Sequence, residues 1–203
     1  MKDLVCLAAD KCIEAVLRGL LSSRSEALRI RALDWDGFVH PRRDPGCYNE
    51  GHEFLRGFHG SYEHGLLVFD RDWEGAPFHD VARLEEDVRG RFAIVGLADW
   101  AEVVVVAPEI EAWVWSDSPH VQRALGWEAD QPLRQWLEEK GAWAIGQPKP
   151  ADPKNALQQA LQHVHQPLSS SMFGHIGRTV SVERCTDPAF TRLKNVLTTW
   201  FGV

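Results

Sequence analysis

The stretch Gly65-Leu66-Leu67-Val68-Phe69-Asp70-Arg71-Asp72-Trp73-Glu74-Gly75 decides how this chain can fold. It opens with a continuous apolar run, which is typical of an interior strand in a parallel sheet that is covered on both faces. Acidic residues follow the run directly, and Gly75 allows the chain to turn behind them. The stretch therefore predicts a buried strand that ends in a carboxylate-rich loop.

Segments before and after this strand are predicted to add further strands, which together form a sheet. Apolar runs or alternating patterns predict further strands over 4–8, 27–33, 92–96 and 102–107, and helical periodicity predicts helices over 10–21, 50–57 and 81–91. The Pro- and Gly-containing segment 34–49 is predicted to be a loop. Strands that alternate with helices indicate an α/β fold, with a mostly parallel sheet flanked by helices.

The pattern becomes all helical after Pro108. Helices are predicted over 109–115, 118–125, 131–139, 153–163, 169–180 and 187–200. We therefore expect an α/β core over residues 1–107 and a C-terminal helical extension over residues 108–203, packed on the core as one structural unit.

Length and composition place the chain among soluble globular proteins. Its 203 residues are enough for about one domain, and no apolar run reaches the roughly 18 residues of a membrane span. The four cysteines form no C-x-x-C pair, which agrees with a reducing compartment. We expect a cytoplasmic protein with no membrane partner. Its nine tryptophans indicate a core rich in large aromatics, with base stacking or partner binding as the alternative.

The net charge limits how the chain could meet nucleic acid. A formal charge of −7 argues against a protein that coats nucleic acid through bulk positive charge. The charge is uneven, because residues 147–203 hold six basic and three acidic residues, a net +3, whereas residues 1–146 carry a net −10. Acids gathered at strand ends suit a metal-centred phosphodiester site, which the net charge does not exclude.

Two pairs of acids follow predicted strands. Asp70 and Asp72 stand at the tip of the central strand, and Glu109 and Glu111 come directly after the last strand. Carboxylates at this spacing can bring oxygens to one hard cation such as Mg²⁺. We expect Asp70 and Asp72 to bind Mg²⁺ or Mn²⁺, and Glu109 or Glu111 to complete the shell or orient the attacking water. For Glu109 the alternative is stabilisation of a helix dipole.

Three segments together resemble the Toprim-like proteins: Val5-Cys6-Leu7-Ala8-Ala9-Asp10-Lys11, the stretch around Asp70, and Pro108-Glu109-Ile110-Glu111-Ala112-Trp113-Val114-Trp115-Ser116-Asp117. The layout is most similar to a Toprim-like family that is encoded beside ATPases in bacterial anti-phage operons and includes a component of methylation-associated defence systems. The resemblance implies a Toprim-like sheet and a Mg²⁺-dependent, nuclease-type site for nucleic-acid phosphodiesters. It also implies a defence ATPase as partner, and it leaves homo-oligomerisation open.

The first of these segments departs from the family pattern. Where the resemblance places a glutamate, the chain has Ala8-Ala9, with Ala9 as the counterpart. An alanine can neither bind a metal nor move a proton. Three explanations stay open: Glu109 or Glu111 substitutes, the protein is catalytically weakened, or Ala9 is an introduced inactivating change. The rival function is a catalytically inactive Toprim-like binding or scaffold subunit that partners a defence ATPase.

Basic residues near these segments are candidates for contacts with nucleic-acid phosphates. One follows the first strand, two stand in the Pro- and Gly-containing loop, and two lie in the basic extension: Lys11, Arg42, Arg43, Lys149 and Lys154. The alternative for each of them is an ordinary solvated side chain.

Overall fold

A parallel sheet forms the centre of the fold. The structure is a computed structural model that describes residues 1–116, 118–179 and 181–203. Over these residues the sheet has four strands in the order β2-β1-β3-β4, namely β1 (Lys2–Ala8), β2 (Trp35–Val39), β3 (Tyr62–Asp70) and β4 (Ala101–Val106). All three strand pairings are parallel. The predicted α/β class with a mostly parallel sheet is therefore confirmed.

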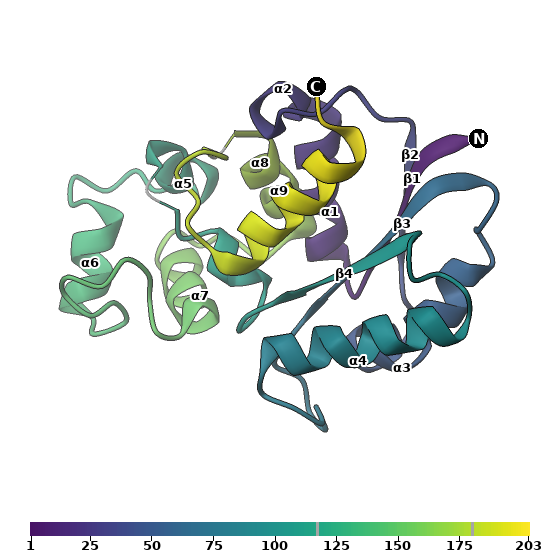
Figure 1. Cartoon of the computed structure of the whole chain (residues 1–203). Helices are drawn as coiled ribbons and strands as arrows, with labels where there is room; N and C mark the ends of the chain where they lie inside the picture. The colour runs from purple at the N-terminus through teal and green to yellow at the C-terminus, as the bar shows by residue number, and fades with distance from the viewer. Residues whose placement is uncertain (117, 180) are drawn as a thin grey trace.

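Helices cover both faces of the sheet (Figure 1). One face carries α3 (Arg43–Arg56) and α4 (Val81–Ile94), and the other carries α1 (Lys11–Ser23), the short α2 (Ser25–Leu28) and α9 (Pro188–Phe201). Because both faces are covered, the apolar run from Leu66 to Phe69 is 0% exposed at every position. This double burial explains why β3 reads as a continuous apolar run instead of an alternating one.

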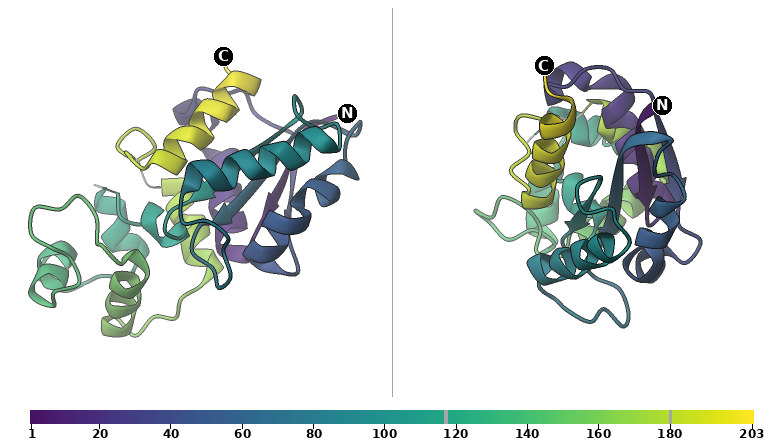
Figure 2. Two further views of the ribbon diagram at one scale, coloured as in Figure 1. Left: turned by 60° about the horizontal axis from the view of Figure 1, so that its bottom comes forward. Right: turned by 45° about the vertical axis from the view of Figure 1, so that its right-hand side comes forward.

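The helical extension starts with the 3₁₀ helix η1 (Ile110–Trp113) and continues through α5 (Pro119–Ala124), α6 (Leu133–Glu139), α7 (Pro153–His163) and α8 (Ser170–Thr179). Figures 1 and 2 show α6 and α7 beside the sheet layers, whereas α8 runs against α1. Glycines make the contact between α1 and α8 close, since a Cβ atom on Gly19 would lie 2.5 Å from the carbonyl oxygen of Gly174. The extension is therefore joined to the sheet layers by direct backbone packing.

Tryptophans fill the interior of the extension. Four of them are at most 7% exposed: Trp113, Trp115, Trp127 and Trp143. The indole N–H of Trp113 donates to Asp187 Oδ1, and that of Trp115 donates to the Pro153 carbonyl. Hydrogen-bonded, buried indoles are core residues, which confirms the core explanation for these four. Within the described ranges, every helix is too short or too polar to cross a bilayer.

The strand predicted over 27–33 is wrong. These residues form the end of α2 and a turn in which Arg29 adopts a φ of 58°. Leu28 and Ile30 are buried, and Ile30 bridges to Gly202 at the end of α9. Two buried side chains on either side of a turn residue therefore imitate the period-two pattern of a strand.

The strand predicted over 92–96 and the loop predicted over 34–49 are wrong as well. Phe92 belongs to α4, where it continues the buried stripe of Leu84 and Val88 at a spacing of four residues, and Ile94 is 86% exposed. The predicted loop contains β2 and the first half of α3. β2 escaped prediction because it is half-exposed along most of its length and has no apolar run.

The helices predicted in the extension correspond to η1 and to α5 through α9, with shifted ends for all of them except α7, whose bounds match the prediction. The 109–115 helix is only a 3₁₀ turn over Ile110–Trp113. Val180, predicted as the last residue of one helix, and Asp117, in the third resembling segment, lie outside the described residues. The division into a 1–107 core and a 108–203 extension remains a prediction.

Candidate functional site

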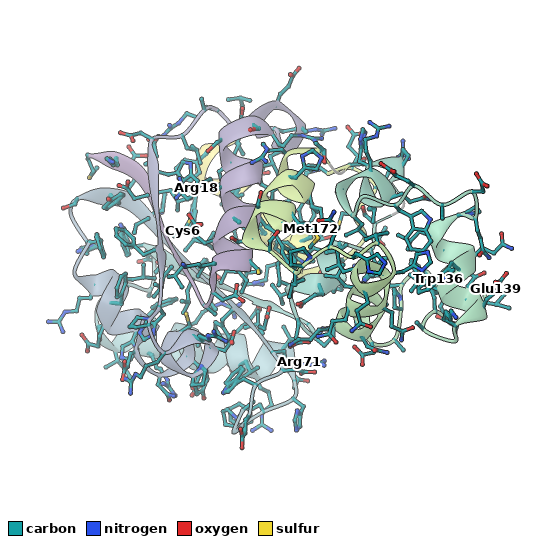
Figure 3. All side chains as sticks on the ribbon, turned by 180° about the vertical axis from the view of Figure 1, so that it is seen from behind. Cys6, Arg18, Arg71, Trp136, Glu139 and Met172 are labelled. Carbon is teal, nitrogen blue, oxygen red and sulfur yellow. The ribbon has the colours of Figure 1, made fainter. Side chains whose placement is uncertain are left out.

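The order of the strands marks a crevice at the carboxyl edge of the sheet. β2 lies on one side of β1, whereas β3 and β4 lie on the other, so the winding reverses between β1 and β3. In open α/β sheets, ligands bind outside the carboxyl ends of the strands at such a reversal. Ala9 follows β1 there and donates its N–H to the Val68 carbonyl of β3 at 3.0 Å. Figure 3 labels Arg71, directly after the end of β3.

Asp70 ends β3 as a buried carboxylate with an unused oxygen. The residue is 8% exposed, and among the described residues its Oδ1 has no hydrogen-bond partner. Burial raises the pKa of Asp70 well above its usual range, and the negative charges of Asp44 and Glu111 raise it further. The side chain therefore holds a proton more tightly than an exposed aspartate does.

Four further acids surround Asp70, and we call the group of Asp10, Asp44, Asp70, Glu109 and Glu111 the acidic edge. Asp44 lies in the first turn of α3, and its Oδ1 accepts a hydrogen bond of 2.9 Å from the Asp70 backbone N–H. Burial raises the pKa of Asp44, and Asp10 and Glu109 add to this shift. Asp10 caps α1 through its Oδ1, which accepts from two N–H groups of the first turn. The acidic edge thus draws on β3 and on three separate segments around it.

Glu109 and Glu111 reach the acidic edge from the segment after β4. This segment stays beside the end of β3, because the Asp72 N–H donates to the Pro108 carbonyl at 3.1 Å. Glu111 is 6% exposed, and burial raises its pKa, with Glu109 adding to the shift. Glu109 accepts a hydrogen bond from the ammonium group of Lys154 in α7. The helical extension therefore supplies both a carboxylate and a cation to the crevice.

Two of the residues expected to take part in chemistry occupy other environments. The carboxylate of Asp72 pairs with Arg71 at 2.6 Å, and the Asp72 side chain is 44% exposed. Its role as a cation ligand remains a prediction. Ala9 is 0% exposed at the crevice, so the residue after β1 contributes no carboxylate there. The nearest acid in that segment is Asp10, one residue further on.

The five basic candidates fall into two groups. Three are paired with acids: Arg42 with Glu50, Lys149 with Asp187, and Lys154 with Glu109. Lys11 and Arg43 are exposed, and over the described residues their side chains take part in no hydrogen bond or ion pair. Lys149 contributes to the fold, because Asp187 also caps α9 and accepts from an indole N–H.

The acidic edge fits a divalent cation in its chemistry. It offers carboxylate oxygens, the donors that Mg²⁺ and Mn²⁺ prefer, and the Oδ1 of Asp70 is buried without a partner. In the part of the chain that the structure describes, no three Asp, Glu, His or Cys side chains are gathered as a ready ligand set. A cation bound here would be anchored by Asp70, and the side chains of Glu111 and Asp10 would have to turn toward it to complete a site.

Sequence reasoning leaves two residues of the acidic edge, Asp10 and Asp44, out of the predicted site. Predicting a loop over 34–49 hides the first turn of α3. An aspartate followed by Pro45 and a helix-period stretch is a helix start signal, and it could have placed Asp44 at the carboxyl edge.

Comparison of the chain with protein-family models, with curated proteins and with solved structures gave no match. The resemblance to Toprim-like proteins therefore rests on the three short segments alone. Because a fold does not define a function, the function has to be argued from the acidic edge and its surroundings.

Proposed function

We propose that the acidic edge binds Mg²⁺ or Mn²⁺ and, through it, a phosphodiester group of nucleic acid. The chain would then be a cytoplasmic, Toprim-like, nuclease-type subunit of a bacterial anti-phage system. The observation that carries this proposal is the Oδ1 of Asp70, which is buried and unpaired at the reversal of the sheet. A buried carboxylate without a partner costs folding free energy, and a bound cation offsets that cost.

Four residues of the acidic edge act on the ligands in this proposal, and Asp44 supports Asp70 by accepting a hydrogen bond from its backbone N–H. Asp70 holds the cation with help from Glu111 and Asp10, and the cation, when bound, stabilises negative charge on the phosphate oxygens. Glu109 takes the proton of the attacking water, because Ala9 cannot. Lys154, which lies against Glu109, donates to a phosphate oxygen.

Cation binding has to displace the proton that burial favours on Asp70. The pKa of this carboxyl is raised in the folded chain, so the ionised form that a metal needs is scarcer at low pH. Affinity for Mn²⁺ should therefore increase as the pH rises. A site made of exposed carboxylates would lack this dependence near neutral pH.

A titration of matched variants tests the proposal. Mn²⁺ binding is measured by calorimetry and electron paramagnetic resonance, and cleavage is measured on plasmid DNA and on single-stranded RNA. Asp70→Asn should lose both, whereas Asp130→Asn, an exposed control in the extension, should lose neither. The Mn²⁺ affinity of Asp72→Asn shows whether Asp72 is one of the cation ligands. If the unaltered protein does not bind Mn²⁺, or if Asp70→Asn binds it equally well, the proposal is wrong.

A specific observation favours the inactive binding or scaffold subunit as a second candidate. The position of Ala9 supplies no carboxylate, and Glu109 is held by Lys154. Restoring the acid with Ala9→Glu separates the two candidates. If Mn²⁺ binding or cleavage appears only in the restored protein, the chain as given is an inactive form. If neither protein binds Mn²⁺, the scaffold subunit is favoured, whereas an active enzyme cuts without the change.

A further inference from the structure

A cleft of about 340 Å³ lies beside the acidic edge, between the loops that follow β1 and β2. Its lining includes Ala9, Lys11, Cys12, His40, Pro41 and Arg43. We propose that this cleft binds the phosphate group of a nucleotide or of a nucleic-acid strand, with Lys11 and Arg43 as its cations. We call it the phosphate cleft.

The charges in the phosphate cleft favour an anion. Lys11 and Arg43 each bring a positive charge, and Asp10 brings one negative charge. Burial lowers the pKa of His40, so its ring is largely neutral at neutral pH. The lining residues therefore carry a net charge of about +1 at neutral pH.

The two cations are unused within the chain. Over the described residues, the side chains of Lys11 and Arg43 have no hydrogen-bond or ion-pair partner, although Arg42, next to Arg43, pairs with Glu50. Lys11 and Arg43 both line the cleft directly. Two like charges at one cleft repel each other, and an anion between them removes that repulsion.

Ala9 makes the cleft suitable for an anion. A glutamate at this position would add a carboxylate at the cleft wall and cancel its net positive charge. Ala9 therefore provides no carboxylate to the acidic edge, and for the same reason it leaves the neighbouring phosphate cleft open and positively charged. Val39 and Pro41 line the same cleft and offer apolar surface to the sugar that carries the phosphate.

The first test measures oligonucleotide binding without divalent cations and at low salt. Fluorescence anisotropy compares a 5′-phosphorylated single-stranded DNA with the same strand ending in a hydroxyl, and inorganic phosphate and a nucleoside monophosphate serve as competitors. Lys11→Gln and Arg43→Gln should each weaken binding of the phosphorylated strand about tenfold, the loss of one charged hydrogen bond. Competition by inorganic phosphate assigns the cleft to free phosphate as well as to strand ends.

A matched control lies on the same helix. Arg56, at the other end of α3, pairs with Glu53, and Arg56→Gln removes the same charge away from the cleft. This variant should bind like the unaltered protein. If Arg43→Gln and Lys11→Gln bind as tightly as Arg56→Gln, the phosphate cleft is refuted.

A second pair of variants separates the effect of negative charge at position 9 from the effect of side-chain size. Ala9→Gln and Ala9→Glu add side chains of nearly equal size, and only the glutamate adds charge. Ala9→Glu should weaken phosphate binding more than Ala9→Gln does, and the opposite order contradicts the inference. The Lys11 and Arg43 variants, which are exposed, decide the question if both Ala9 variants fail to fold. Asp70→Asn should abolish cation binding and leave phosphate binding at the cleft unchanged, so the two proposals can fail separately.

Discussion

Replacing Gly19 by alanine should push α1 away from α8. The new Cβ would lie 2.5 Å from the carbonyl oxygen of Gly174 and 2.9 Å from the backbone nitrogen of Arg178. Close C···O contacts are about 3.3 Å, so backbone has to move by nearly 1 Å. Overpacking of this kind costs about 3 kcal/mol when backbone lies on both sides, and the helix propensity of alanine offsets about 1 kcal/mol. The expected net loss is about 2 kcal/mol of unfolding free energy, or a Tm lower by about 4–8 °C.

Gly90 provides the control for this prediction. It is exposed in α4, and no atom outside its own helix lies within 4 Å of a Cβ built there. Gly90→Ala should therefore stabilise the protein by up to about 1 kcal/mol. Urea unfolding followed by circular dichroism, together with calorimetry, measures both variants. If Gly19→Ala proves as stable as Gly90→Ala, the close contact between α1 and α8 does not exist.

Three further predictions concern ionisable groups that are buried or half-buried. Because the pKa of Asp70 is raised in the folded chain, stability falls as the pH rises from about 4 through the raised value, so without metal Asp70→Asn should be the more stable form at neutral pH. That gap should shrink toward pH 4 in denaturation experiments, and a constant gap would contradict a raised pKa as its cause. Arg192→Met should destabilise the protein by about 1–3 kcal/mol in urea, because Arg192 pairs with the buried Glu85 at 3.1 Å while Arg89 remains paired with it; unchanged stability would refute this. Cys12, with a pKa of about 12, should react slowly with iodoacetamide at mildly alkaline pH, and rapid labelling seen by mass spectrometry would show a more exposed thiol.

The sequence predicts β1, β3 and β4 better than the edge strand β2 for a physical reason. β1, β3 and β4 are buried on both faces, so their apolar runs are continuous. β2 is held by pairing with β1 and needs no apolar run of its own, and it includes Asp36 and Gly37. A strand that depends on its neighbour leaves little local signal.

The candidate site also contains features that the sequence could locate and features that it could not. Acids at or shortly after the ends of strands, such as Asp70 and Glu111, could be located from the sequence because parallel strands end at one edge. The hydrogen bond from the Asp70 N–H to Asp44 joins residues 26 positions apart, and the pairing of Lys154 with Glu109 spans 45 positions. Contacts of this range are set by the packing of α3 and of the extension. For the same reason, the sequence could not tell an unused cation from a paired one.

The proposed roles of the acidic edge and the phosphate cleft complement each other because the two sites carry opposite charges. A phosphodiester is an anion, and the carboxylates around Asp70 repel it unless a cation lies between them. The neighbouring Lys11 and Arg43 supply attraction that does not depend on that cation. Binding of a strand at the phosphate cleft and binding of Mn²⁺ at Asp70 should therefore favour each other, since each reduces the repulsion that the other ligand meets. Mn²⁺ should therefore increase the affinity of the unaltered protein for the phosphorylated strand. It should not change the affinity of Asp70→Asn.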